Sequence, residues 1–390
     1  LNDITTGANN VALGAYALKT ATTALNNVVI GKGAGEDISA AVALSGTIAI
    51  GFEAFKGSGS TSTAANGTLA IGQEALKVLT TGSSNTAVGY ETGKAMTTGS
   101  ANTFIGYQCA NTGVVTGGEN TGLGVTALQA LTSGGTNTAL GVRAGLVLTE
   151  GDSNVFVGKD AGDSATVINE AVLIGHNAGH TISTSTAVDG TVGIGAEALA
   201  GLTSGEKNTA VGYQAGNILT TGTENTIIGY DADVDDDGRH GCIVIGAGLS
   251  LNTASHNVVE IGNNTNSMTY DLDGGDITVT SDVRTKKNIK DTKLGLEFIN
   301  KLRPITYETK PTSEYPKEFE IKNPSEESSG KTWDGLIAQE VKEAIDEMGV
   351  GFSGWEEGIN TKQRLAYGKF VMPLIKSVQE LSAEIDKLKK

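Results

Sequence analysis

The chain has 390 residues, of which 54 are glycine, and only 5% of its residues are aromatic. Glycine is thus nearly twice its usual share of roughly 7%, and the aromatic side chains are too few for a conventional large core. The formal net charge of −16 excludes a protein that binds nucleic-acid backbones or adheres to anionic lipid. Since no apolar run approaches the ~20 residues of a membrane-spanning helix, we expect no membrane insertion.

The composition changes near residue 281. Residues 1–281 contain 46 glycines, no proline or tryptophan, 9 basic and 25 acidic residues. Residues 282–390 contain all five prolines, both tryptophans, and 19 basic and 19 acidic residues. Two different structures are therefore joined. We predict a glycine-rich repeat region at 1–264, a connecting strand and turn at 265–280, and a second domain at 281–390.

Internal repeats fill the first segment. Phrases such as NNVALGAYA, SNTAVGYET and KNTAVGYQA recur around a central glycine, with spacings of 16 to 21 residues. The central glycines are Gly14, Gly31, Gly51, Gly72, Gly89, Gly106, Gly124, Gly141, Gly158, Gly175, Gly195, Gly212, Gly229, Gly246 and Gly262. Helical pairs and propeller blades need repeats of roughly 33 to 45 residues. About fifteen 17-residue repeats instead predict a parallel β-solenoid whose coils each have two short strands and two tight corners.

Other positions of the repeat also recur in residue type. Val, Leu or Ile directly precedes the glycine, as at Ile105, and Val, Ile, Leu or Thr stands two residues earlier, so we expect a strand with this face buried. The glycine itself allows a bend or a close backbone approach. Alanine three residues after it, as at Ala127, predicts an interior with room for a methyl group. Asparagine four residues before it, as at Asn137, can tolerate αL at a corner and is expected to bond the neighbouring turn.

Fifteen coils rising ~4.8 Å each would form a rod of about 70 Å. Such thin coils bury little apolar surface in one chain, so we expect a parallel homotrimer. The phrase N-x-A-I/V-G-x-x-A, recurring from residue 9 to about 264, resembles the repeat of trimeric β-roll heads in bacterial autotransporter adhesins. The longer N-T-A-V-G-Y-Q-A-G version resembles the repetitive shafts of phage tail fibres. The resemblance implies a mainly β, trimeric parallel β-solenoid (β-roll) shaft.

After residue 264 the repeat gives way to MTYDLDGGDITVT, for which we predict a final strand and turn. LGLEFINKL and LIAQEVKEAIDEM read as amphipathic helices, and PTSEYPKEFEIKNPSEESSG between them as a polar loop. The last segment carries apolar residues at the three- and four-residue steps of a coiled-coil seam: Val371, Leu374, Val378, Leu381, Ile385 and Leu388. We therefore predict an α-rich domain that ends in a trimeric coiled coil.

Four motifs follow one another in the second segment: S-D-x-R-x-K-x-N-I from Ser281, then LRPITY, GLIAQEV and a C-terminal helix with Q-E-L. In this order they resemble the endosialidase-type intramolecular chaperone domain of phage tail spikes and fibres, over residues 281–390. The resemblance implies a domain that trimerises, brings three chains into register and then cuts itself off. It places the cut at the Ser281–Asp282 motif, with Lys286 as the activating base. Whether the cleaved bond precedes or follows Ser281 is left open by the sequence.

The chemistry implied is a single-turnover Ser/Lys autoproteolysis that needs no cofactor. Ser281 would attack a nearby peptide carbonyl, and a lysine serves as its base only if burial lowers the lysine pKa towards neutrality. Lys287 and Lys290 are rival bases, and the motif spacing favours Lys286. We expect no multiple-turnover activity in the repeat region.

One metal candidate lies in the repeats. Asp233, Asp235 and Asp237, followed by glycine, copy the first half of a calcium loop. Val244 stands where that loop requires a bidentate glutamate, so we expect a solvated acidic turn and no metal.

These features predict the distal segment of a phage tail fibre or spike, a virion protein assembled in the host cytoplasm. It would bind a host cell-surface glycan or protein receptor and join other tail proteins upstream, because the chain begins at Leu1 without a methionine. A polysaccharide-degrading spike is an alternative. Such an enzyme needs two catalytic carboxylates about 5 to 9.5 Å apart, whereas the acidic residues here are scattered over short repeats. A trimeric bacterial adhesin head is a second alternative, but the sequence lacks the C-terminal membrane-anchor strands expected of such an adhesin.

Overall fold

The chain divides into two compact units, Leu1–Ser281 and Asp282–Lys390. The structure is a computed structural model, and it describes residues 6–39, 43–59, 65–182, 188–251, 256–264, 267–272, 277–279, 287–317, 326, 330–357 and 362–389. Within these ranges, no helix combines the length and the apolar character that a membrane span requires.

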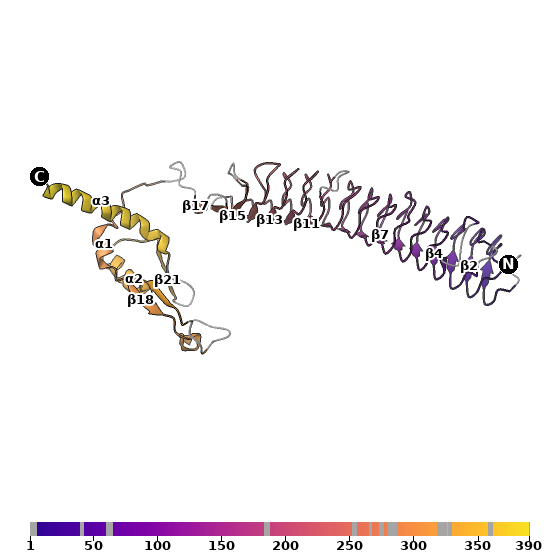
Figure 1. Ribbon diagram of the computed structural model, residues 1–390, viewed down its shortest axis with the longest axis horizontal. Coiled ribbons are helices and arrows are strands. Elements are labelled where there is room, and N and C mark those ends of the chain that lie inside the picture. Colours follow the sequence, from indigo (N-terminus) through magenta and orange to yellow (C-terminus); the bar gives the residue numbers. More distant parts are fainter. Residues whose placement is uncertain are drawn as a thin grey trace. The chain divides into compact units, whose positions relative to one another are not determined.

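The first unit is a stack of short parallel strands that form a continuous row (Figure 1). The strands are β1 (Val11–Leu13), β2 (Val28–Ile30), β3 (Ile48–Ile50), β4 (Leu69–Ile71), β5 (Thr86–Val88), β6 (Thr103–Ile105), β7 (Thr121–Leu123), β8 (Thr138–Leu140), β9 (Val155–Val157), β10 (Val172–Ile174), β11 (Val192–Ile194), β12 (Thr209–Val211), β13 (Thr226–Ile228), β14 (Ile243–Ile245) and β15 (Val258–Gly262). Equivalent repeat positions pair throughout, as Leu123 does with Leu140. The structure thus confirms a mainly β protein with a parallel β-solenoid.

The stack ends in antiparallel strands. β16 (Ser267–Asp271) runs antiparallel to β15, and β17 (Ile277–Val279) antiparallel to β16. The final strand expected in MTYDLDGGDITVT is therefore present, followed by a second one. Because the pairing direction reverses here, the solenoid cannot continue beyond β15.

Each described coil has one strand, which corrects the prediction of two. The opposite side of the coil consists of turns whose backbone groups bond the next coil, as when the Leu128 N–H donates to the Ala144 carbonyl over 3.0 Å. Thr126 and Leu128 have φ angles of 54° and 50°, left-handed values that interrupt an extended chain. Alternating left-handed residues replace the second strand while keeping the hydrogen bonds along the stack.

The buried face of the strands is the opposite of the one we expected. The central residue of each strand points into the coil, and Ala87, Phe104 and Phe156 are fully buried. The aliphatic residues on either side point outwards, with Ile105 36% and Leu123 42% exposed. Alternation shows which residues share a face, but not which face lies inside. The narrow interior selects the central residue, together with a buried alanine in the following turn, as predicted.

The central glycines pack backbone against backbone. Gly106 has a φ of 137°, and a Cβ atom built on it would lie 2.1 Å from the carbonyl oxygen of Gly124 in the next coil. Any side chain here would therefore collide with the neighbouring main chain. The expected close approach is confirmed.

Buried asparagines form a ladder next to the glycines. The side chain of Asn137 donates to Asn120 Oδ1 (3.0 Å) and to the Gly151 carbonyl (2.7 Å), while its backbone N–H also donates to Asn120 Oδ1 (3.0 Å). The predicted bonds to the neighbouring turn are present. The left-handed conformation belongs to the preceding residue, such as Thr136 with a φ of 57°, because the asparagine already belongs to the extended segment.

The second unit is smaller and less regular. It contains helices α1 (Leu296–Lys301), α2 (Ala338–Glu347) and α3 (Val371–Leu388), in the three predicted segments, and the 3₁₀ turns η3 (Thr312–Glu314) and η6 (Tyr367–Phe370). Two antiparallel hairpins that we did not predict add β18 (Ile305–Glu308) with β19 (Thr332–Gly335), and β20 (Trp355–Glu357) with β21 (Gln363–Leu365). The core centres on Phe298, Phe352 and Phe370, whose ring centroids lie 4.8 to 6.2 Å apart.

Candidate functional site

The predicted cleavage residues Ser281, Asp282 and Lys286 lie outside the described residues. The rival bases Lys287 and Lys290 are described, and both are exposed. Their ammonium groups are thus not removed from water, which a lysine base requires. The choice of Lys286 as the base stays a prediction that rests on the motif spacing.

One face of α3 is anchored to its own unit. Pro373 and Ser377 are buried, and the Glu380 carboxylate accepts the backbone N–H of Leu296 over 2.7 Å. Leu296 is the first residue of α1, so the carboxylate also lies at the positive end of that helix. These contacts fix the rotation of α3 about its axis.

The other face of α3 carries the predicted seam. All six of its residues are exposed, from 42% for Leu381 to 88% for Leu388. Val371, Leu374 and Val378 also line a shallow apolar hollow of about 340 Å³. A helix with one anchored face therefore presents a row of apolar side chains outwards.

The solenoid carries a second apolar surface, which we call the outer strand face. It consists of the residue before each central glycine and the residue two places earlier, and each of them is at least partly exposed. Its members are Val11, Leu13, Val28, Ile30, Ile48, Ile50, Leu69, Ile71, Thr86, Val88, Thr103, Ile105, Thr121, Leu123, Thr138, Leu140, Val155, Val157, Val172, Ile174, Val192, Ile194, Thr209, Val211, Thr226, Ile228, Ile243, Ile245, Val259 and Ile261. The expectation that these side chains lie inside the coil is wrong, and the sequence pattern does not reveal this surface.

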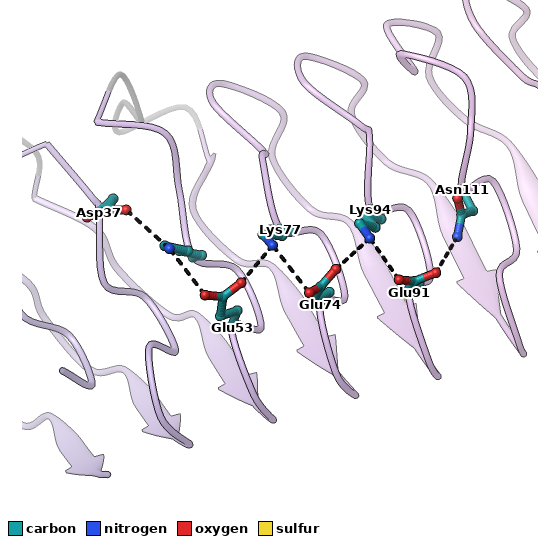
Figure 2. Close-up of polar contacts among 8 residues, drawn as sticks. Asp37, Glu53, Glu74, Lys77, Glu91, Lys94 and Asn111 are labelled. Carbon is teal, nitrogen blue, oxygen red and sulfur yellow. Dashed lines mark hydrogen bonds and ion pairs between the residues drawn. The ribbon is translucent and has the colours of Figure 1, made fainter. Parts of the chain in front are cut away.

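A chain of ion pairs follows another edge of the solenoid (Figure 2). Lys77 Nζ lies 2.7 Å from Glu53 and 3.3 Å from Glu74, and Lys94 Nζ lies 2.6 Å from Glu74 and 2.7 Å from Glu91. Each cation thus bridges two successive coils. The sequence signal, a glutamate two residues and a lysine five residues after the central glycine, was overlooked.

The same contacts shift the titration of the ladder. Hydrogen bonding to Lys94 holds the pKa of Glu91 at about 2, below its ordinary 4.5, with a further contribution from Gln108. The pKa values of Glu53 and Glu74 are lowered as well, chiefly by Lys77 and Lys94 respectively. The ladder is therefore fully charged at neutral pH, and its charges compensate one another.

The acidic insertion does not gather its carboxylates. Asp233 accepts the backbone N–H groups of Ile218 and Val234, each over 2.8 Å, and burial raises its pKa to about 6. Asp235 instead pairs with Arg239 at 2.8 Å. No three His, Cys, Asp or Glu side chains in the described ranges lie close enough together to hold a metal ion. Two of the three candidate ligands thus have other partners.

Comparison with known proteins identifies the segment that contains the predicted cleavage site. Residues 281–350 match the family model described as the chaperone of endosialidase. Together with the solenoid, this match confirms the predicted resemblance to a phage tail fibre or spike that carries such a chaperone at its C-terminus. No curated protein matches the chain.

Proposed function

We propose that the chain is the distal part of a trimeric phage tail fibre or spike that attaches the virion to the host surface. The proposal rests on one observation: a segment that matches the chaperone of endosialidase, residues 281–350, follows a β-solenoid in the same chain. A rod that repeats its surface in every coil and in three copies suits multivalent binding, which raises avidity over that of single weak sites. The receptor would be a cell-surface glycan or protein.

The second unit would hold the three chains together while the solenoid winds. Its seam on α3 is apolar, exposed and spaced as in a coiled coil. The buried Ser377 and the bond from Leu296 to Glu380 lie on the anchored face of α3, which leaves the seam on the exposed side. Pairing three chains of near-identical repeats carries a loop-closure cost and invites slippage. A clamp at one end lowers that cost.

Release of the clamp would follow from the Ser281–Asp282 motif. Lys286, in its neutral form, takes the proton of the Ser281 hydroxyl as the oxygen attacks a neighbouring peptide carbonyl. The peptide C–N bond then breaks, the departing amine takes up the proton, and water hydrolyses the resulting ester. One bond is cut once per chain, without a cofactor.

Intact mass under denaturing conditions tests this proposal. We expect two fragments that divide near residue 281 from the wild type, and one full-length chain from Ser281→Ala and from Lys286→Ala. Lys287→Ala and Lys290→Ala are matched controls that should still be cut. An uncut wild-type chain would refute self-release and leave residues 282–390 as a permanent cap. A monomeric native mass of the Ser281→Ala chain would refute the trimer.

A further inference from the structure

We infer that copies of this chain pack against one another through the outer strand face of the solenoid, and that blocks of threonine on this face fix their register. The inference rests on the proposed trimer and adds to it where the chains meet and what aligns them. The α3 seam concerns only the C-terminal end, whereas the outer strand face extends from β1 to β15.

The chemistry of the face suits an interface between like chains. All its thirty residues are valine, leucine, isoleucine or threonine, although the chain has a net charge of −16. Acidic copies can therefore meet here without placing like charges together. A strip about 70 Å long and 10 Å wide offers on the order of 700 Å², close to the roughly 800 Å² per partner of a standard interface.

The geometry of the face selects a copy of this chain as the occupant. Its rows recur at the spacing of paired β-strands, about 4.8 Å, so a matching partner must itself be a stack of strands. Coils of unequal length do not disturb this spacing, because Val28 pairs with Ile48 and Ile48 with Leu69 across repeats of 20 and 21 residues.

The two rows of the face differ in composition. The residue directly before the glycine is always aliphatic, whereas the other row alternates in blocks. In chain order these blocks are four aliphatic residues (Val11, Val28, Ile48, Leu69), four threonines (Thr86, Thr103, Thr121, Thr138), three aliphatic residues (Val155, Val172, Val192), two threonines (Thr209, Thr226) and two aliphatic residues (Ile243, Val259). The blocks, of four, four, three, two and two residues, do not recur at a constant interval along the chain.

This pattern distinguishes the aligned arrangement from shifted ones. When copies are in register, threonine faces threonine and the hydroxyl groups can bond each other. A shift by one coil puts threonine against an aliphatic side chain at each of the four block boundaries, and a shift by two coils does so at eight places. A hydroxyl buried against methyl groups has no partner, which costs free energy. Register would then be held along the whole rod, even after the clamp has left.

Cysteine cross-linking in the full-length chain tests the inference. Leu123→Cys and Leu140→Cys each place a thiol on the face, and the native Cys109 and Cys242 are buried. A disulfide needs Cβ atoms within about 4.5 Å, so a shift of ~4.8 Å prevents it. We expect each variant alone to cross-link within its trimers. In co-expressed chains that carry one variant each, disulfides between the two different positions should be about tenfold fewer than disulfides between like positions. A free-energy difference of about 1.4 kcal/mol between the aligned and the shifted arrangement is enough for this tenfold ratio.

The outcomes separate the inference from the proposed trimer. A trimeric mass without cross-links at either position would place the contact on another face and overturn the inference, while the trimer stands. Mixed disulfides as abundant as the like ones would show that register is not fixed. A monomeric mass would overturn both the inference and the trimer.

A second pair of variants tests the threonine blocks themselves. Changing Thr86, Thr103, Thr121 and Thr138 together to valine should keep the trimeric mass and raise the mixed disulfides towards the level of the like ones. The same four positions changed to serine keep their hydroxyl groups and should behave as wild type. If the valine variant keeps the wild-type ratio, the blocks do not set the register. The cysteine variants with native threonines remain decisive if the valine variant does not fold.

Discussion

The two units are stabilised by different kinds of contact, which join neighbouring coils in the solenoid and distant segments in the second unit. In the solenoid, equivalent positions of successive coils pair with each other, as Asn137 bonds Asn120 and Leu123 pairs with Leu140. In the second unit, one core of seven buried residues holds segments that are far apart in sequence, as in the bond between Leu296 and Glu380. A repeat array loses stability at an altered coil and its neighbours, whereas a small single core unfolds as one unit.

The largest expected effect is a collision in the glycine row. In Gly106→Ala the new methyl group would lie about 2.1 Å from the Gly124 carbonyl oxygen, at a φ of 137°. We expect a loss of about 3 kcal/mol or more, measured by urea unfolding followed by circular dichroism. Gly46→Ala is the control, because it also has a positive φ but no atom near the added methyl group, so it should lose only about 1 kcal/mol. Equal losses would contradict the close-approach explanation.

An effect of similar size is confined to the second unit. Phe298→Ala removes the ring that contacts both Phe352 and Phe370, and a loss of about 3 to 5 kcal/mol is typical of such truncation. Both tryptophans, Trp333 and Trp355, belong to this unit. Their fluorescence should therefore report the loss, while the circular dichroism of the solenoid melts as in the wild type. A matching shift of both signals would show that the units unfold together.

The smallest effect is the pH dependence of the ion-pair ladder. The pKa of Glu91 is lowered in the folded chain, so its contribution to stability is present above pH 4.5 and is lost as the pH falls towards about 2. Because Lys94 is 35% exposed, we expect less than about 1 kcal/mol, reduced further by salt. The difference in urea midpoint between wild type and Glu91→Gln should shrink over this pH range. A constant difference would show that the pair adds nothing.

The repeat architecture could be predicted because one position admits only glycine. The backbone contact between Gly106 and Gly124 excludes every other residue, so the period is visible in the sequence. The orientation of the strands could not be predicted in the same way. Ile105 and Thr103 share a face by alternation, and only the width of the coil decides that Phe104 lies inside.

The candidate site in the second unit was predictable in part. The three helices carry apolar residues at helical spacing, and the seam of α3 is exposed as a coiled-coil seam requires before association. The β18–β19 hairpin gave no such signal, because Tyr307 and Trp333 face each other across strands of four residues that are mostly exposed. Their pairing depends on contacts between distant segments, which local patterning does not encode.

The direction of the hydrogen bonds in the solenoid determines how it carries a mechanical load. The bonds between strands, such as those joining β7 to β8, run along the rod axis, so axial tension loads the coils in series. A coil that yields releases about 17 residues, or roughly 55 Å of extended chain, while the remaining coils stay wound. A shaft built in this way lengthens step by step under load and absorbs work at each step before its covalent chain is stretched taut.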